Sequence, residues 1–288
     1  MNCHFVPDSE AGSAYALARA YSFGLALLVM LGSSRYAAAL PPYPSCSSNL
    51  MVPAVASSQG QVGTAFRSDV WLLNMSPGES RFLVAYRCST GCDNRVPHVA
   101  EVFVPPGTIG LFKNVVVSLF NAPESAGALL FSQCGFGNFT VNPPMVISRT
   151  YTAAPSGSGT MGTEVPSFTT DRLTRFALFV GLAGNGGALD RGYRTNCGIV
   201  PFFGVSAIVR LSLRASSGAT LATGDIAATD PVQLNDVFGA LGAPTVVTED
   251  ASLTVESDVP VLPYCIVIDN LSGDGVFLPF STERPPAR

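Results

Sequence analysis

The sequence predicts an all-β protein made of two tandem antiparallel β-sandwiches, each with one short helix. Three observations lead to this prediction. Apolar residues make up 47% of the chain and charged residues only 12%, which is too apolar for a disordered protein. The 28 glycines and 22 prolines interrupt short apolar runs and so indicate many turns. The second half of the chain also repeats the first.

The N-terminal segment has the layout of a cleaved secretory signal peptide. Arg19 precedes an apolar stretch over residues 20–31, and small residues then lead to three alanines before Leu40. Because the uncharged run covers only residues 20–34, it is shorter than the roughly 20 residues of a spanning helix, although a retained anchor is the alternative. We expect a secreted, periplasmic or cell-surface protein without a stable membrane span after cleavage.

The cysteines fit an exported protein. One of the seven lies in the signal segment, which leaves an even number for an oxidising compartment. Cys88 and Cys92 flank Ser-Thr-Gly and could close a tight loop. Six cysteines permit 15 pairings, so the spacing leaves the connectivity open. The disulfide candidates are Cys46, Cys88, Cys92, Cys134, Cys197 and Cys265.

The internal repeat is domain-sized. Five blocks align in the same order, namely 51–69 with 178–196, 79–87 with 206–214, 110–120 with 232–242, 143–152 with 259–268 and 162–168 with 275–281. Repeats of this length should each bury their own core. We therefore expect a signal peptide over 1–39, a first sandwich over 40–170 and a second over 171–288.

Most repeated blocks have the period-two pattern of half-buried strands. In "RFLVAYR" the side chains of Phe82, Val84 and Tyr86 share one face, and "AIVRLSL" in the second copy alternates in the same way. Turns every 8–12 residues indicate an antiparallel sandwich, and we expect seven strands per copy.

One block departs from the strand pattern. In "LNDVFGAL" a capping Asn235 or Asp236 precedes Val237, Phe238 and Leu241 at helical spacing. Its counterpart "KNVVVSLF" is β-branched and would be assigned to a strand by itself. The second copy therefore predicts a short helix at this position of both sandwiches.

The best-matched strand carries the same charged and polar pattern twice. In "AFRSDVWLLN" the side chains of Arg67 and Asp69 lie on one side, and Arg194 and Asn196 repeat the arrangement in "GYRTNCGIVP". An arginine that binds a carboxylate or a glycan is the functional interpretation. We favour a structural role, because the pattern is kept in two copies whose loops differ.

The chain resembles tandem immunoglobulin-like β-sandwich repeats of secreted proteins from GC-rich bacteria. The resemblance covers about residues 51–281 and rests on "FRSDVWLLN" with "YRTNCGIV", on "QLNDVF", on "SRTYT" and on the closing "VIDN". Family members read Asn-Pro or Asn-x-Ser after the first strand; Asn74 with Ser76 keeps this pattern, whereas Pro201-Phe202-Phe203 departs from it. The resemblance implies a fold and export, since the family has no defined activity.

The immunoglobulin-like resemblance also suggests a disulfide framework. In such sandwiches an early and a late strand are often bridged across the two sheets, which implies a Cys197–Cys265 bond. With Cys88 and Cys92 paired in their tight loop, Cys46 and Cys134 are left to pair. That last bond would tie the N-terminal segment to a long loop.

Groups suited to catalysis are scarce. His98 is the only histidine after cleavage, no G-x-S-x-G elbow occurs, and a surface or hydrogen-bonded histidine is the default interpretation. The spacing of "CSTGC" suits a metal, but no second pair resembles it. "DNLSGDG" is better explained as a turn than as a calcium loop. Four carboxylates that a glycosidase could use lie among turn residues: Asp225, Asp230, Glu249 and Asp250. We predict no catalytic residue, no metal and no cofactor.

The two copies differ most in a long loop. "SQCGFGNFTVNPP" (132–144) stands where the second copy has little more than "ESDVP". Loops on rigid sandwiches commonly carry recognition, so Phe136, Asn138 and Phe139 form the candidate binding loop. The alternative is that both rings pack back onto their own sheet.

These features favour an exported, non-catalytic protein that acts in adhesion, surface binding or scaffolding. Its partner would be a cell-envelope protein or a glycan of unknown identity. The net charge of −4 and the absence of a basic stripe make nucleic acid an unlikely partner. The alternatives are a secreted carboxylate-dependent hydrolase and a periplasmic assembly factor that donates or accepts a strand.

Overall fold

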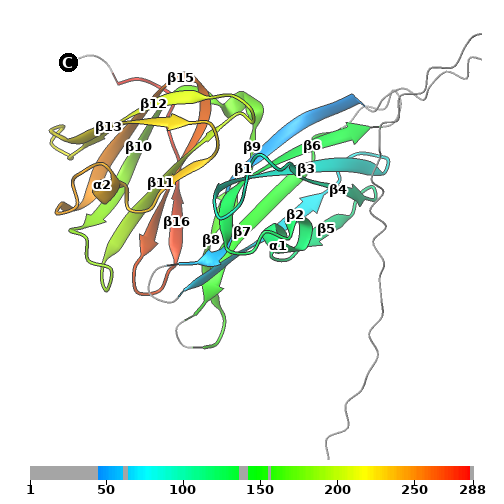
Figure 1. The fold of residues 1–288 in the computed structure, drawn as a ribbon, viewed down its shortest axis with the longest axis horizontal. Helices are drawn as coiled ribbons and strands as arrows, with labels where there is room; N and C mark the ends of the chain where they lie inside the picture. The colour runs from blue at the N-terminus through cyan, green and yellow to red at the C-terminus, as the bar shows by residue number, and fades with distance from the viewer. Residues whose placement is uncertain (1–44, 61–63, 136–141, 155–156, 286–288) are drawn as a thin grey trace, which may run out of the picture. The chain divides into compact units, whose positions relative to one another are not determined.

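The computed structural model describes residues 45–60, 64–135, 142–154 and 157–285, which belong to one compact unit of the chain. The predicted signal peptide and the candidate binding loop with Phe136, Asn138 and Phe139 lie outside the described residues. The described chain is mostly β, with two antiparallel sheets and two short α-helices (Figure 1). The predicted all-β class is therefore confirmed.

The first half forms two layers around a shared core. One layer has the order β4-β3-β6-β1, and the other consists of β5, β2, β7 and β8. The end of β1 also pairs with β2, which joins the layers into one sheet. The elements are β1 (Ser45–Gln59), β2 (Ala65–Leu73), β3 (Ser80–Thr90), β4 (His98–Val104), β5 (Ile109–Phe112), α1 (Val115–Phe120), β6 (Ser125–Gly135), β7 (Met145–Ala153), β8 (Thr160–Pro166), β9 (Phe168–Thr169) and the 3₁₀ turn η2 (Thr170–Arg172).

The second half repeats this arrangement with one strand fused. The long strand β15 pairs with β10 and β12 over its first part and with β11 and β16 over its last part. The first part of β15 therefore corresponds to β6, and its last part corresponds to β7. The elements are β10 (Thr174–Asn185), β11 (Tyr193–Pro201), β12 (Ala207–Arg214), β13 (Thr220–Ala228), β14 (Val232–Leu234), α2 (Val237–Ala240), β15 (Val247–Asp269) and β16 (Gly275–Leu278).

The two halves share not only the pairing order but also the register. Val52 lies opposite Leu129, and Phe179, which is 127 positions after Val52, lies opposite Leu253. The aligned blocks 143–152 and 259–268 need a shift of one position, because Ser148 opposes Val70 whereas Cys265 opposes Cys197. The expected seven strands occur in the second half. The first half has nine described strands, since β6 and β7 are separate and β9 is added.

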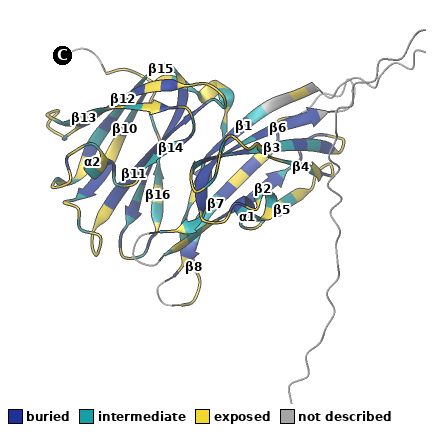
Figure 2. Cartoon of the chain, viewed as in Figure 1, coloured by how far each residue is buried: buried dark blue, intermediate teal, exposed yellow. Residues whose placement is uncertain are grey.

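Each half buries an apolar core between its layers. In the first, Phe82, Val84 and Tyr86 are fully buried from β3, as their period-two pattern predicts. In the second, Val209, Leu211 and Leu213 occupy the same places on β12, while Ile208 lies on the exposed side. Burial of these side chains accounts for the alternation of exposure along the strands in Figure 2.

The repeated polar residues of β2 and β11 hold the short helices in place. Asn114 and Asp236 precede α1 and α2 with φ angles of 44° and 61°, and neither makes a side-chain capping bond. The backbone N–H of Asn114 instead donates to Asp69 Oδ1 at 2.8 Å, and that of Asp236 donates to Asn196 Oδ1 at 3.0 Å. The short helices are thus fixed by a neighbouring strand rather than by their own caps.

A second polar contact is also made twice. Ser68 Oγ accepts a hydrogen bond from the backbone N–H of Ala56 at 2.8 Å. Thr195 Oγ1 accepts one from Ala183, 127 positions further along the chain, at 2.9 Å. These contacts explain why a Ser or Thr stands between the Arg and the Asp or Asn in both copies.

All three predicted disulfides are present: Cys46–Cys134, Cys88–Cys92 and Cys197–Cys265. The expected geometry of the last was wrong. Cys197 and Cys265 lie directly opposite each other on the paired strands β11 and β15, so this bond is within one layer and does not cross between layers. Cys46 and Cys134 likewise face each other on β1 and β6.

A third apolar cluster joins the two sandwiches. Val200, Leu262 and Tyr264 from the second half pack against Met51 and Ala128 from the first half. At the edge of this contact Arg87 forms an ion pair with Asp230, and the backbone N–H of Gly162 donates to Asp274 Oδ1 at 3.1 Å. The contact brings side chains of both sandwiches to one cavity.

Candidate functional site: a cavity between the two sandwiches

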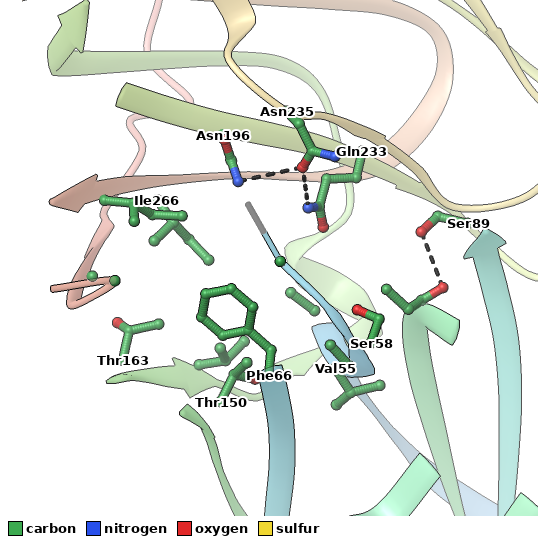
Figure 3. Close-up of a pocket in the computed structure, with 18 of the residues that line it drawn as sticks. Val55, Ser58, Phe66, Ser89, Thr150, Thr163, Asn196, Gln233, Asn235 and Ile266 are labelled. Atoms are coloured by element: carbon green, nitrogen blue, oxygen red, sulfur yellow. Dashed lines mark hydrogen bonds between the residues drawn. The ribbon is translucent and has the colours of Figure 1, made fainter. Parts of the chain in front are cut away.

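A cavity of about 550 Å³ lies where the two sandwiches meet (Figure 3). Strands β1 and β2 form one side, and β11, β14 and the last part of β15 form the other. A volume between about 300 and 1,000 Å³ is typical of sites for small molecules. The cavity is therefore large enough to be a candidate site for a small molecule.

Part of the cavity wall is apolar. Val55 and Phe66 contribute from the first sandwich, and Ile266 and Ile268 from the second, with the ring of Tyr264 beside them. Gly198 leaves the room that this ring needs, because a Cβ at position 198 would clash with it. Such a wall would cover the apolar face of a ligand.

A chain of side-chain hydrogen bonds forms the polar part of the second-sandwich wall. Tyr264 Oη donates to Gln233 Oε1 at 3.0 Å, and Gln233 Nε2 donates to Asn235 Oδ1 at 2.7 Å. Asn196 Nδ2 donates to the same Asn235 oxygen at 3.3 Å. Burial raises the pKa of Tyr264 above its usual range, so the phenol stays neutral at physiological pH. The network presents neutral amide groups to the cavity (Figure 3).

Arg194 brings a buried positive charge to this wall. Arg194 is only 7% exposed, and its Nη1 donates a hydrogen bond to Asn270 Oδ1. Its Nε has no hydrogen-bond partner among the described residues. Burial lowers the pKa of Arg194 and the charge of Asp236 opposes this effect, but a guanidinium remains protonated in proteins. Arg194 is therefore a buried cation that could donate hydrogen bonds to the acceptor oxygens of a ligand in the cavity.

The first-sandwich wall contributes hydroxyls and a carboxylate. Glu124 Oε2 accepts a hydrogen bond from the backbone N–H of Gln59 at 3.2 Å. Its backbone has a φ of 56°, the left-handed region that few residues other than glycine adopt. Ser89 Oγ donates to the carbonyl of Ala126, and Ser58 lies nearby in Figure 3. Among the described lining residues Glu124 is the one carboxylate.

Only two of the four residues of the repeated Arg-x-Asp/Asn pattern lie at the cavity. Arg194 and Asn196 line the cavity, whereas Arg67 and Asp69 do not. Asp69 instead serves α1 and accepts a second hydrogen bond from Tyr151 Oη at 3.2 Å. The motif that repeats in sequence therefore has one copy beside the cavity and one away from it.

His98 and the acidic residues considered for catalysis do not meet at this site. The ring of His98 lies 6.1 Å from that of Tyr86 and is not part of the cavity. Asp230 pairs with Arg87, Asp250 accepts from Thr248 Oγ1 at 2.6 Å, and Asp225 and Glu249 do not line the cavity.

Sequence reasoning missed Phe66, Glu124, Gln233 and Tyr264 as site residues. They come from four strands or turns of two halves and carry no shared motif. One difference between the copies could have pointed to this site. Trp71 of β2 corresponds to Gly198 of β11, and Ile147, which lies opposite Trp71, corresponds to Tyr264, which lies opposite Gly198.

The described chain holds no group of three or more His, Cys, Asp or Glu side chains arranged for a metal ion. Within the same residues, no helix combines the length and apolarity required to cross a bilayer.

Comparisons with protein-family models and with curated proteins found no match. A comparison with solved structures found similarity to the lectin from Pleurotus ostreatus in complex with GalNAc, at 13% identity and a TM-score of 0.19. The match covers 85% of this chain and 79% of the lectin chain. A likeness at this TM-score is too weak to support conclusions about the site.

Proposed function

We propose that this protein is an exported, non-catalytic binding module that holds a glycan-type ligand in the cavity between its sandwiches. The observation that supports the proposal is the convergence of amides, hydroxyls and a buried arginine from both halves on one cavity of about 550 Å³. Sugars present both hydroxyl groups and apolar ring faces. The amide network of Gln233 and Asn235 suits the hydroxyls, and Phe66 and Tyr264 suit the ring faces.

The three disulfides support export, because such bonds persist in oxidising compartments. In that setting the partner would be a saccharide of the cell envelope or of an extracellular matrix. The two sandwiches would hold the residues of the cavity wall in their binding positions even in the absence of the ligand. Preorganisation of this kind lowers the entropic cost of binding.

The proposal is tested by calorimetric titration of the mature protein, residues 40–288, with cell-envelope oligosaccharides. Phe66→Ala should weaken binding of the recognised saccharide at least tenfold, because it removes a ring from the wall. Phe103→Ala is the matched control, since Phe103 lies on β4, is 54% exposed and is not a lining residue. Equal binding by both variants would contradict the cavity as the site.

A hydrolase is the competing proposal, and the cavity allows a direct test. Acid–base cleavage of a glycosidic bond commonly uses two carboxylates, of which the described wall supplies Glu124. Mature protein should bind the recognised saccharide without releasing reducing ends over long incubation. Turnover that disappears in Glu124→Gln would replace the binding proposal with the hydrolase.

Edge strands favour the periplasmic assembly factor as a second candidate. β4 and β13 end the described sheet paths and each pairs on one side only. An incoming strand could extend either edge by backbone hydrogen bonding. Substituting proline for Ala100 in β4 or Thr223 in β13 should abolish capture of an unfolded partner strand if this role is correct, and should leave saccharide binding unchanged.

A further inference from the structure

An exposed apolar surface covers one side of the first sandwich, away from its core. It consists of the outward side chains of β5, β2 and β7, which form two rungs across the sheet: Ile109–Leu73–Met145 and Leu111–Trp71–Ile147. We call these six residues the β2 face. Ile109 is 61% exposed, Met145 50% and Leu111 46%. Along β7 the outward residues alternate with buried ones in Figure 2.

The second sandwich carries the same face, and there it is buried. By register, Val200 corresponds to Leu73, Leu262 to Met145 and Tyr264 to Ile147. These three residues are at most 3% exposed, because they pack on the first sandwich in the cluster that joins the two halves. This face is therefore a contact surface of the fold, used in one copy and uncovered in the other.

The surface that receives the buried face is already occupied in the first sandwich. It is formed by Met51 and Ala128, with Leu130 packed against them. The corresponding residues of the second sandwich, by the same register, are Leu178, Ser252 and Thr254. Two hydroxyls replace two aliphatic side chains there, so this surface offers the β2 face a poorer apolar match. An endless head-to-tail chain of sandwiches is thus disfavoured.

The apolar surface that best matches the β2 face is the β2 face itself. We propose that two copies of the chain associate through their β2 faces in a two-fold symmetric dimer, in which first sandwich meets first sandwich. A two-fold contact uses the same patch on both subunits and is the commonest form of homo-oligomer. Beyond Ile147 on the same side of the sheet, Arg149 lies opposite Glu164 at the border of the patch, so the arginine of one subunit can pair with the glutamate of the other across the axis.

The size of the face sets the strength of the dimer. Strands lie about 4.8 Å apart and rise about 3.3 Å per residue, so this part of the sheet spans a few hundred Å². Stable interfaces bury about 800 Å² per partner, and smaller ones belong to weak complexes. The dimer is therefore concentration-dependent, and it leaves the cavity between the two sandwiches accessible, since none of the six residues lines that cavity.

Trp71 provides a reporter within the contact, because it is the chain's single tryptophan. Sedimentation velocity of the mature protein over a wide concentration range should show a monomer–dimer equilibrium. The Trp71 emission should shift to the blue, and its quenching by acrylamide should fall, as the dimer forms. Both signals should follow the same concentration dependence.

Two substitutions test the assignment of the face. Ile147→Lys and, separately, Ile109→Lys should weaken dimerisation at least tenfold, because each places a charge in the contact. Ile208→Lys is the matched control, since Ile208 is 54% exposed on β12 of the second sandwich. Ile109 is the more exposed of the two test sites, so Ile109→Lys keeps the test valid if Ile147→Lys disturbs the fold.

Three results would overturn the proposal. One is a wild-type protein that stays monomeric at every concentration. Another is a dimer that forms equally well in both lysine variants. The third is a monomer whose Trp71 is already shielded from acrylamide, which would mean that another segment of the same chain covers the face.

Discussion

The first sandwich lacks the disulfide that links β11 to β15 in the second, and the register shows where it would go. Val70 and Ser148 lie directly opposite each other on β2 and β7, as Cys197 and Cys265 do on β11 and β15. Both residues are fully buried, and Ser148 Oγ has no hydrogen-bond partner among the described residues. We predict that the double substitution Val70→Cys with Ser148→Cys forms a fourth disulfide.

The expected gain in stability follows from the loop that the bond closes. The two positions are 78 residues apart (148 − 70), slightly more than the 68 of the native Cys197–Cys265 bond. Chain entropy for a loop of this length is worth about 4.5 kcal/mol. Loss of a methyl group at position 70 costs about 1 kcal/mol, whereas removing an unpaired buried hydroxyl returns about 1 kcal/mol or more. The last two contributions roughly cancel, so the first sandwich should gain about 4.5 kcal/mol.

Denaturant unfolding followed by Trp71 fluorescence measures this gain, because Trp71 adjoins position 70 and reports the first sandwich alone. Peptide mapping without reduction identifies the new bond, and the variant with alanine at both positions is the control for the lost side chains. A correctly folded variant whose two cysteines stay free would refute the register of β2 and β7. A bond that forms without raising the unfolding midpoint would refute the entropic estimate.

Three further predictions concern the native contacts. Replacing Cys88 and Cys92 by serine should lower the free energy of unfolding by about 2 kcal/mol, because the bond closes a loop of only 4 residues. Replacing Cys46 and Cys134 should lower it by about 4.5 kcal/mol, because their separation is 88 residues; denaturant unfolding midpoints compare the two variants. Asp69→Ala should cost about 1–3 kcal/mol by leaving the Asn114 N–H without its acceptor, whereas Asp69→Asn, the amide found at the same position in β11, should cost under about 0.5 kcal/mol in thermal unfolding. Burial raises the pKa of Tyr86 to about 12, although the hydrogen bond with Ser125 opposes this shift. The contribution of Tyr86 to stability should therefore be complete below pH 10 and fall by about 2–3 kcal/mol between pH 10 and pH 12, because only the unfolded phenol ionises there. Tyr86→Phe should flatten this fall in pH-dependent unfolding, and an unchanged slope would show that Tyr86 is not its source.

Local patterns were sufficient to predict most of the fold. The alternation around Phe82 and Val84 correctly identified the buried face of β3, and the comparison of two copies correctly placed a helix at "KNVVVSLF", where β-branched residues alone favour a strand. The disulfide pairs were also predicted correctly. The position of Cys197–Cys265 within one layer was not, because the immunoglobulin-like resemblance implied a bridge across the two sheets, whereas β11 and β15 are hydrogen-bonded neighbours.

The candidate site was largely beyond prediction for a different reason. Its residues belong to the surfaces of two separate sandwiches, and such surfaces carry no periodicity that says which of them meet. Arg194 and Asn196 were noticed only because they repeat Arg67 and Asp69, and that repetition favoured a structural role. The structural role is visible in the contact of Asn196 with Asp236, so the same side chain serves the fold with its oxygen and faces the cavity network with its nitrogen.

The difference between Trp71 and Gly198 explains how one fold can carry two uses of the same face. In β11 the absence of a side chain at position 198 leaves the space that the Tyr264 ring occupies. The ring packs there in the cluster that joins the halves, and its hydroxyl donates to Gln233 Oε1 at 3.0 Å. In β2 the corresponding position holds the large indole of Trp71, between Leu111 and Ile147 in the register. A Gly198→Trp substitution would fill the space of the Tyr264 ring and should separate the sandwiches and abolish the cavity together, because both depend on that ring. The Tyr264 ring thus contributes both to the contact between the halves and to the wall of the candidate site.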